Sequence, residues 1–448
     1  MTVPAKTDVA KTRQPKTVQT QPGRAWIASL SKWLTPSRIR AQAIVLALCL
    51  WGVCAIDFAT PDLLDRAGNI KFQDFLPSYI AAQLIAQGRA AELYNEQVTA
   101  TAMQAIVAQP TRVRLPNLYG PQVGLFFAPL ARFSFPVAAR IWVVASLLVF
   151  AACIYLVWNC CPNLRPYGGT VFLCAIAFPP LFHFFVRAQM SAVVLACFTS
   201  AFLAFREDRS WLAGVALGFL FFKPQFLTAV PLVLLLSQAW KPLIGLVLSA
   251  SAQLLFTRIY FGPAVLETYF DTLRHMPQVI GGVELSLAPI QMHSLRSFWT
   301  LLIPWPEVAL APYALSSILA IAIAAAVWRS SHPLAIRFSA LTLAAVLVNP
   351  HLFVYDLLVL SPVLLLLVAW ARDRTVDCNM IKIKASPASL PTLNLLLYLV
   401  YILPLFGPLS RWTHVQVSVP AFAALLWLLW RLPVFPSRQL ASNESSVV

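Results

Sequence analysis

Asp74 is an acidic residue that directly follows the first strongly apolar stretch of the chain and opens an aromatic, helix-prone run. An aspartate at a membrane surface can accept the proton of an attacking hydroxyl group. Cations placed opposite it would stabilise the negative charge that grows on a departing phosphate. The polar residues elsewhere in the chain therefore decide whether Asp74 can take part in a group transfer.

Further polar residues interrupt or border apolar segments far from Asp74. They are Arg187, Gln189, Lys223, Gln225, His293, Arg296, Asn349, His351, Tyr355 and Asp356. An ionisable side chain near membrane depth costs about 2.5–3.5 kcal/mol or more, so such residues tend to face a cavity or to carry a function. Their origin in several separate segments indicates one shared site. No pair of carboxylates has the spacing of a metal site in the predicted outer loops, so we expect neither a metal nor another cofactor.

Within this set we expect Asp74 to be the catalytic base. Lys223, His351 and Arg187 are the candidates for binding a phosphate, and Gln189, Gln225, Tyr355 and Asp356 are the candidates for binding substrate. Structural alternatives stand beside these roles. Asp74 could cap a following helix, Arg187 could anchor at lipid head groups, His351 could be a structural histidine, and Asp356 could pair with a cation to join two helices.

The composition is that of a membrane protein. Of the 448 residues, 59% are hydrophobic and 11% are charged, whereas soluble domains have about 45–50% apolar residues. The net charge is +16, and a polar arm over residues 1–40 holds eight of the lysines and arginines against Asp8 alone. Such an arm is typical of a disordered segment near anionic lipids. We therefore expect membrane lipids as partners and no nucleic acid. The eight cysteines lack metal-ligand spacing and read as small buried hydrophobic residues.

The apolar blocks predict an all-α polytopic bundle of about 10–12 transmembrane helices. The expected spans are 41–58, 136–158, 168–186, 190–205, 211–222, 226–238, 243–261, 308–328, 335–348, 354–370, 391–409 and 417–430. With the N-terminus in the cytoplasm, most lysines and arginines fall on the cytoplasmic side, as the positive-inside rule requires. We thus predict a cytoplasmic arm over 1–40, a membrane domain over 41–432 and a cytoplasmic tail over 433–448, with the site facing the periplasm or outside.

Two outer segments are long. The first, about 59–135, is predicted to hold amphipathic helices along the membrane, one near 77–88 that stops at Gly88 and one that follows Asn95 as N-cap. The second, about 262–307, contains Pro263, Pro277 and further breakers, so we expect it to be irregular.

Several short motifs resemble glycosyltransferase family 87, the bacterial polyprenol-phosphate-mannose-dependent mannosyltransferases of the GT-C class. The resemblance covers about 41–430. It comprises Asp74-Phe75 with Tyr79 and Ala81-Ala82, Gly88, Ala91, Leu93-Tyr94, Tyr119-Gly120-Pro121, Leu125-Phe126, Pro129-Leu130, Gln189, Lys223-Pro224-Gln225, and Pro350-His351 through Tyr355-Asp356. A turn expected as Gly-Gln reads Ala188-Gln189 here.

The resemblance implies a multi-pass protein of the bacterial inner (plasma) membrane that transfers a hexose, with mannose as the expected sugar, from a polyprenyl-phosphate carrier to a lipid or glycan acceptor. It also implies inversion at the sugar, Asp74 as base and His351 at the phosphate. Two other functions stay open. A transporter or flippase for a lipid-linked sugar would carry polar groups through mid-membrane and often shows paired halves, and an assembly scaffold would need no such cluster.

Overall fold

The computed structural model describes residues 29–107, 115–275, 289–380 and 389–433, and it is helical throughout these ranges, with only isolated β-bridges between loops. Most of the predicted arm and the tail from residue 434 onward lie outside the described residues. The prediction of an all-α polytopic membrane protein is confirmed.

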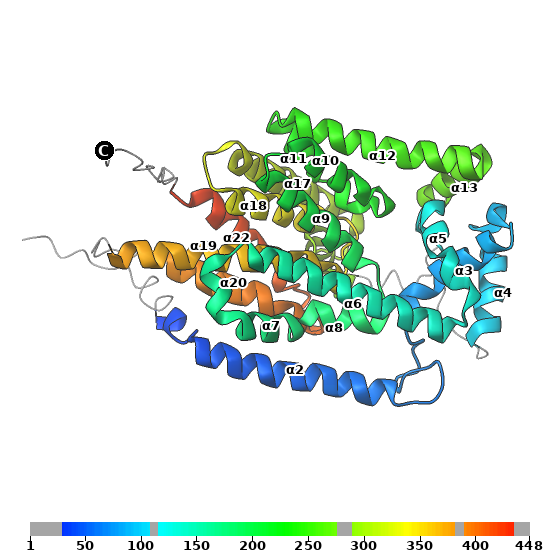
Figure 1. Ribbon diagram of the computed structural model, residues 1–448, viewed down its shortest axis with the longest axis horizontal. Coiled ribbons are helices and arrows are strands. Elements are labelled where there is room, and N and C mark those ends of the chain that lie inside the picture. The colour runs from blue at the N-terminus through cyan, green and yellow to red at the C-terminus, as the bar shows by residue number, and fades with distance from the viewer. Residues whose placement is uncertain (1–28, 108–114, 276–288, 381–388, 434–448) are drawn as a thin grey trace, which may run out of the picture.

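Within the described ranges, six helical stretches are long and apolar enough to cross a membrane. They are α2 (Pro36–Phe58), α6 (Phe135–Asn159), α12 (Trp240–Phe261), α17 (Pro306–Arg329), η7 with α19 (Val354–Arg374) and α20 with η8 and α21 (Ser389–Thr413). A seventh forms if η4 and α7 (Pro162–Ile176) and α8 (Pro179–Arg187) count as one span bent by 50°. Figure 1 shows α2, α6, α12 and α19 running in broadly the same direction, with α2 along one side of the bundle.

Five shorter apolar helices complete the bundle. They are α9 (Ser191–Arg206), α10 with η5 (Ser210–Phe222), η6 with α11 (Pro224–Leu236), α18 (Leu334–Val348) and α22 (Ser418–Arg431). Each of the twelve apolar segments predicted from the sequence falls on one of these helices or on a long span. The short helices are tolerated because protein surrounds them, and α18 is buried along almost its whole length.

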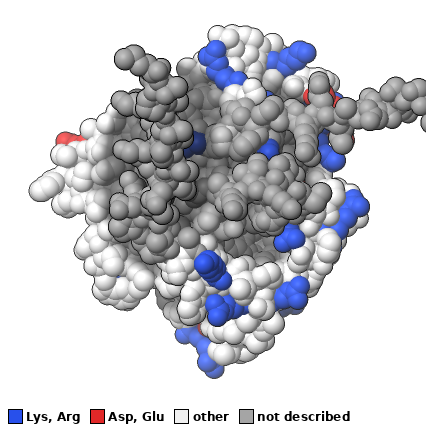
Figure 2. Space-filling view, turned by 90° about the vertical axis from the view of Figure 1, so that its left-hand side faces the viewer, with Lys and Arg blue, Asp and Glu red and all other residues white. Residues whose placement is uncertain are grey.

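The two ends of the bundle differ in charge. Arg206 ends α9, Arg209 precedes α10, Arg329 ends α17, and Arg372 lies in the second half of α19. These arginines lie at what we call the basic end, together with the start of α2. Figure 2 looks at this end and shows lysine and arginine side chains around its rim, with few acidic ones. The opposite ends of α8, α9, η5 and α18 carry the polar residues singled out in the sequence, and we call this the site end.

Helices α10 and α12 approach each other closely through small residues. A Cβ atom added to Gly214 would lie 2.0 Å from the carbonyl oxygen of Pro242, and one added to Gly245 would lie 2.2 Å from that of Trp211. Contacts of this kind drive helix association where lipid removes the hydrophobic advantage. Helix α10 leads into η5, which ends just before Lys223. The contact between α10 and α12 therefore helps to set the position of Lys223 along the bundle.

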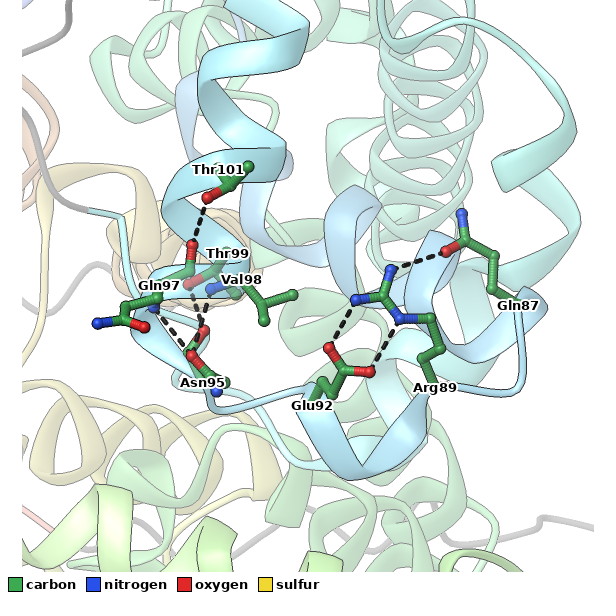
Figure 3. Close-up of polar contacts among 8 residues, drawn as sticks. All are labelled: Gln87, Arg89, Glu92, Asn95, Gln97, Val98, Thr99 and Thr101. Atoms are coloured by element: carbon green, nitrogen blue, oxygen red, sulfur yellow. Dashed lines mark hydrogen bonds and ion pairs between the residues drawn. The ribbon is translucent and has the colours of Figure 1, made fainter.

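The first long outer segment forms a shelf at the site end. It contains η1 (Gln73–Phe75), α3 (Leu76–Ala86), η2 (Ala90–Glu92), α4 (Glu96–Val107), α5 (Pro121–Phe127) and η3 (Ala128–Arg132). Gly88 stops α3 with a φ of +73°. The Asn95 side chain caps α4 by accepting from the backbone N–H groups of Gln97 and Val98 (Figure 3). Helix α3 is buried on most sides because α5 and η3 cover it, whereas α4 buries only Met103 and Val107.

The second long outer segment is more helical than predicted. It holds α13 (Pro263–Arg274) and α16 (Leu295–Leu302), while 276–288 lie outside the described residues. Pro263 was expected to break structure, but it occupies the first turn of α13, where a missing N–H group loses no hydrogen bond. Ser294 and Ser297 form a capping box at the start of α16.

Candidate active site

The loop that carries Asp74 is held in place by the residues before it. The Lys71 ammonium group is buried and donates to the carbonyl oxygens of Thr60 at 2.6 Å, Asp62 at 2.8 Å and Phe58 at 3.3 Å. Phe72 adopts a left-handed backbone with a φ of 59°, and its N–H donates to the carbonyl oxygen of Val186 in α8. These contacts tie η1 to the end of α2 and to α8, and they bring Asp74 next to Arg187.

Asp74 contacts two of the predicted site residues. Its Oδ1 lies 3.7 Å from a guanidinium nitrogen of Arg187, and its Oδ2 accepts from the side-chain amide of Gln189 at 3.2 Å. The Asp74 side chain is 15% exposed and that of Arg187 is 31% exposed, so a substrate can reach both. Phe75, rather than Asp74, holds the N-cap position of α3. The helix-cap alternative for Asp74 therefore does not hold.

Burial raises the pKa of Asp74 above its ordinary value, while the nearby Arg187 charge and hydrogen bonds from Tyr355 and Gln189 pull that pKa down. The same group is thus a stronger base than a free carboxylate and is stabilised in its ionised form by named neighbours. A carboxylate with a raised pKa is better suited to accept a proton than a free one.

The turn between α8 and α9 positions Gln189. Ala188 ends α8 with a φ of 54°, in the left-handed region that favours glycine, and its carbonyl oxygen accepts from the Trp142 indole at 3.0 Å. This backbone conformation would suit glycine, and the Trp142 contact helps to hold alanine in it. The Gln189 carbonyl oxygen accepts from its neighbour Met190 N–H at 2.7 Å and from the Tyr119 hydroxyl at 2.8 Å.

Lys223 and Asp356 form a buried ion pair, with Nζ to Oδ1 at 2.5 Å and exposures of 3% and 1%. Lys223 lies at the break between η5 and η6, where Pro224 interrupts the helix. The Ser191 hydroxyl at the start of α9 donates to the same Asp356 oxygen at 2.7 Å. Asp356 thus joins η7 to two other helices, as the pairing alternative predicted. Its Oδ2 is buried and meets no hydrogen-bond partner among the described residues.

Aromatic contacts connect His351 to this ion pair. The His351 ring meets Phe353 edge-on at 4.8 Å, Phe353 stacks on Tyr355 at 5.4 Å, and the Lys223 ammonium lies 5.4 Å from the Tyr355 ring centre. Burial lowers the pKa of His351 to about 4, although the Asp356 carboxylate opposes the shift. His351 is therefore neutral at neutral pH, and it can meet a phosphate as a hydrogen-bond donor rather than as a cation.

Tyr119 donates to Gln189, which in turn donates to Asp74, and it was not assigned a role from the sequence, although it belongs to the Tyr119-Gly120-Pro121 motif. Burial, then the charges of Asp356 and Asp74, raise its pKa well above the ordinary value, so the hydroxyl stays protonated and donates. Ser191 was also missed, because a serine at the start of an apolar helix carries no distinctive signal. Gln225 is half-buried, and no described side-chain contact joins it to this network.

His293 and Arg296 lie beside the network. His293 is buried, and its ring Nδ1 lies 2.7 Å from the Ser418 hydroxyl. The backbone N–H of His293 donates to the carbonyl oxygen of Leu352. Burial lowers the pKa of His293 to about 3, so it serves as a neutral anchor for the segment that carries His351. In the described ranges, no three His, Cys, Asp or Glu side chains gather in a way that could hold a metal ion.

Fold and site together define a polytopic membrane protein with a carboxylate, two cations and hydroxyl donors gathered at one end of its helices. The chain belongs to glycosyltransferase family 87, whose model matches residues 117–362, more than half of its length. It is therefore a membrane glycosyltransferase. Neither the curated proteins nor the solved structures contain a match to this chain. The matched range includes Tyr119, Arg187 and every later site residue, whereas Asp74 precedes it.

Proposed function

We propose that this glycosyltransferase moves a hexose, with mannose as the expected sugar, from a polyprenyl-phosphate carrier to a hydroxyl group of a lipid or glycan acceptor. The observation that carries the proposal is a chain of contacts at the site end: Asp74 accepts from Gln189 and Tyr355, the Lys223 ammonium lies 5.4 Å from the Tyr355 ring centre, and Lys223 pairs with Asp356. A base and a cationic site lie within one network, as a displacement at a sugar phosphate requires.

In this mechanism Asp74 accepts the proton of the acceptor hydroxyl. The hydroxyl oxygen forms a bond to the anomeric carbon while the bond from that carbon to the carrier phosphate breaks, which inverts the configuration. The leaving group is polyprenyl phosphate, and its extra negative charge lies against Lys223 and Arg187, with a hydrogen bond from His351. The accessible side chain of Asp74 favours it as base over Asp356, which is enclosed and already paired.

Asp356, Tyr355, Gln189 and Gln225 are proposed to bind substrate hydroxyls. Asp356 has an unpartnered buried oxygen among the described residues, which is the strongest case of the four. Gln225 is the weakest candidate, because no described side-chain contact joins it to the network. We further propose a GT-C architecture, a place in the bacterial inner membrane with the basic end in the cytoplasm, and a site that faces the periplasm.

The test uses membranes that contain the full-length protein and polyprenyl-phosphate mannose with a labelled sugar. Transfer of label to a new lipid or glycan product, with release of polyprenyl phosphate, supports the proposal. Polyprenyl-phosphate glucose tests the sugar, and GDP-mannose given to purified protein tests the donor class. Transfer from GDP-mannose without a lipid carrier would contradict the proposed donor, and movement of the intact lipid-linked sugar without cleavage would contradict transfer.

A further inference from the structure

A large apolar cavity lies between α2 and the bundle, away from the candidate active site. Its volume is about 900 Å³, within the range of ligand sites. The wall comes from α2, α7, α19 and α20 and includes Val45, Cys174, Leu365, Leu397 and Tyr401. Helix α2 buries only Ala43, Leu50 and Cys54, and it stands along the side of the molecule in Figure 1. This long, apolar space suits a hydrocarbon chain.

The cavity reaches the basic end, where its lining becomes polar. We call this part of the cavity its mouth, and Tyr167, Thr170 and Arg372 line it. The Arg372 guanidinium group lies 4.2 Å from the Tyr167 ring centre and donates to the Tyr167 hydroxyl at 2.9 Å. Arg40 on α2 donates to the Thr170 hydroxyl at 2.6 Å. Two cations thus approach the mouth from opposite helices.

Neither cation has a carboxylate partner within the described part of the chain, because none of the ion pairs found there includes Arg40 or Arg372. Asp373, the acidic neighbour of Arg372, instead accepts from the Asn163 amide at 2.6 Å. Arg372 Nε is buried and meets no acceptor among the described residues. A buried guanidinium N–H without an acceptor carries a desolvation cost that a bound anion would offset. Phosphate matches the planar donor geometry of arginine.

This mouth is separate from the proposed sugar-phosphate site. Asp356 and Arg372 lie sixteen residues apart on one continuous helical stretch, which places them roughly 24 Å apart along its axis. A phosphate held by Lys223 at the site end therefore cannot also contact Arg372. The isoprenoid tail of a donor bound there would bring no negative charge to the basic end.

We propose that this cavity binds an anionic phospholipid from the leaflet at the basic end. One acyl chain lies between α2, α7 and α20, and the head-group phosphate accepts from Arg372 and Arg40. A phospholipid supplies both the chain and the charge at the depth where the mouth opens, and basic residues at this level attract anionic lipids. The bound lipid fills the space that separates α2 from the bundle.

The first experiment measures lipid retention by native mass spectrometry. The full-length protein is purified from nanodiscs that contain equal amounts of phosphatidylglycerol and phosphatidylcholine. We expect phosphatidylglycerol to be retained preferentially, and Arg372→Gln to lower its retention roughly tenfold, as for one charge-assisted contact. Arg329→Gln removes the same charge from an exposed position at the same end and is expected to change nothing. Equal retention of both lipids, or of phosphatidylglycerol by Arg372→Gln, would overturn the proposal.

The second experiment keeps the test decisive if Arg372→Gln does not fold. A phosphatidylglycerol with a photoreactive acyl chain is expected to crosslink to peptides from α2, α7 and α20 in the wild-type protein. Ala175→Phe, which places a ring in the cavity, should remove these crosslinks while crosslinks to the outward faces of α12 persist. Displacement of the crosslinks by polyprenyl phosphate, but not by unlabelled phosphatidylglycerol, would show that an isoprenoid chain occupies the cavity and would overturn the proposal.

Discussion

The Gln189 side-chain amide donates to Asp74 at 3.2 Å while its carbonyl oxygen accepts from the Tyr119 hydroxyl at 2.8 Å. The Gln189 oxygen also accepts from the Met190 N–H, which can only donate, so the amide nitrogen faces the carboxylate. Asp74 Oδ2 therefore accepts a hydrogen bond from this amide, which favours the ionised carboxylate. The Asp74 side chain is 15% exposed.

Replacing Asp74 by asparagine tests the base. Asp74→Asn keeps the shape of the side chain and removes its ability to take a proton, so we expect transfer to fall about 10²–10⁴-fold. The fold should persist, because the variant removes a charge that burial disfavours. Initial rates and thermal unfolding of the purified protein measure the two effects. Asp62→Asn, at an exposed position in the same loop, is the control and should keep full activity; full activity in Asp74→Asn would end the assignment.

The pH dependence of transfer should report the Asp74 pKa. Because burial raises this pKa, the rate should fall on acidification at a pH above the ordinary aspartate range. The Arg187 charge lowers the same pKa, so Arg187→Gln should move the acidic limb of the profile to higher pH. The measurement is kcat/KM against pH, normalised to each maximum. Arg132→Gln, on the exposed end of η3, should leave the limb in place; an unmoved limb in Arg187→Gln would show that Asp74 does not control it.

Single and double variants of the buried Lys223 and Asp356 pair should distinguish its contribution to stability from its contribution to transfer. Removing one partner strands a buried charge, so Asp356→Asn should lower the free energy of unfolding by about 3–5 kcal/mol. The double variant Lys223→Met with Asp356→Leu removes both charges and should recover most of that loss. Transfer should stay absent in the double variant, because the proposed phosphate contact is gone. Recovery of transfer together with stability would show that the pair is purely structural.

Tyr119→Phe tests the residue that the sequence left unassigned. The variant deletes a half-buried hydroxyl that donates to the Gln189 oxygen, leaving the Met190 N–H as the remaining donor that holds this amide beside Asp74. A lost hydrogen bond of about 1–1.5 kcal/mol corresponds to roughly a tenfold fall in rate. The acidic limb of the pH profile should move as well, since the amide helps to stabilise ionised Asp74. Tyr94→Phe, whose hydroxyl donates to the Tyr119 backbone, is a nearby control that leaves this amide in place.

Short motifs in the sequence singled out several residues that the structure brings together at the site end, but not the contacts between them. Asp74, Lys223, His351 and Asp356 stood out because a charge or an imidazole beside an apolar run needs a physical reason. The residues that contact these four side chains could not be predicted from the sequence in the same way. Ser191 pairs with Asp356 across 165 residues, and Tyr119 meets Gln189 across 70, distances that local patterns do not encode. Likewise, α13 and the burial of α3 depend on neighbouring helices rather than on composition.

The sequence by itself determined that the chain is a helical membrane protein, where its apolar segments lie, and which ionisable residues border them, because apolarity and charge near lipid are strong local constraints. Only the tertiary structure decided that Lys223 pairs with Asp356, that His351 is neutral, and that Asp74 is the accessible carboxylate. Burial and pairing set those properties, and both arise from side chains that folding brings together from distant parts of the chain.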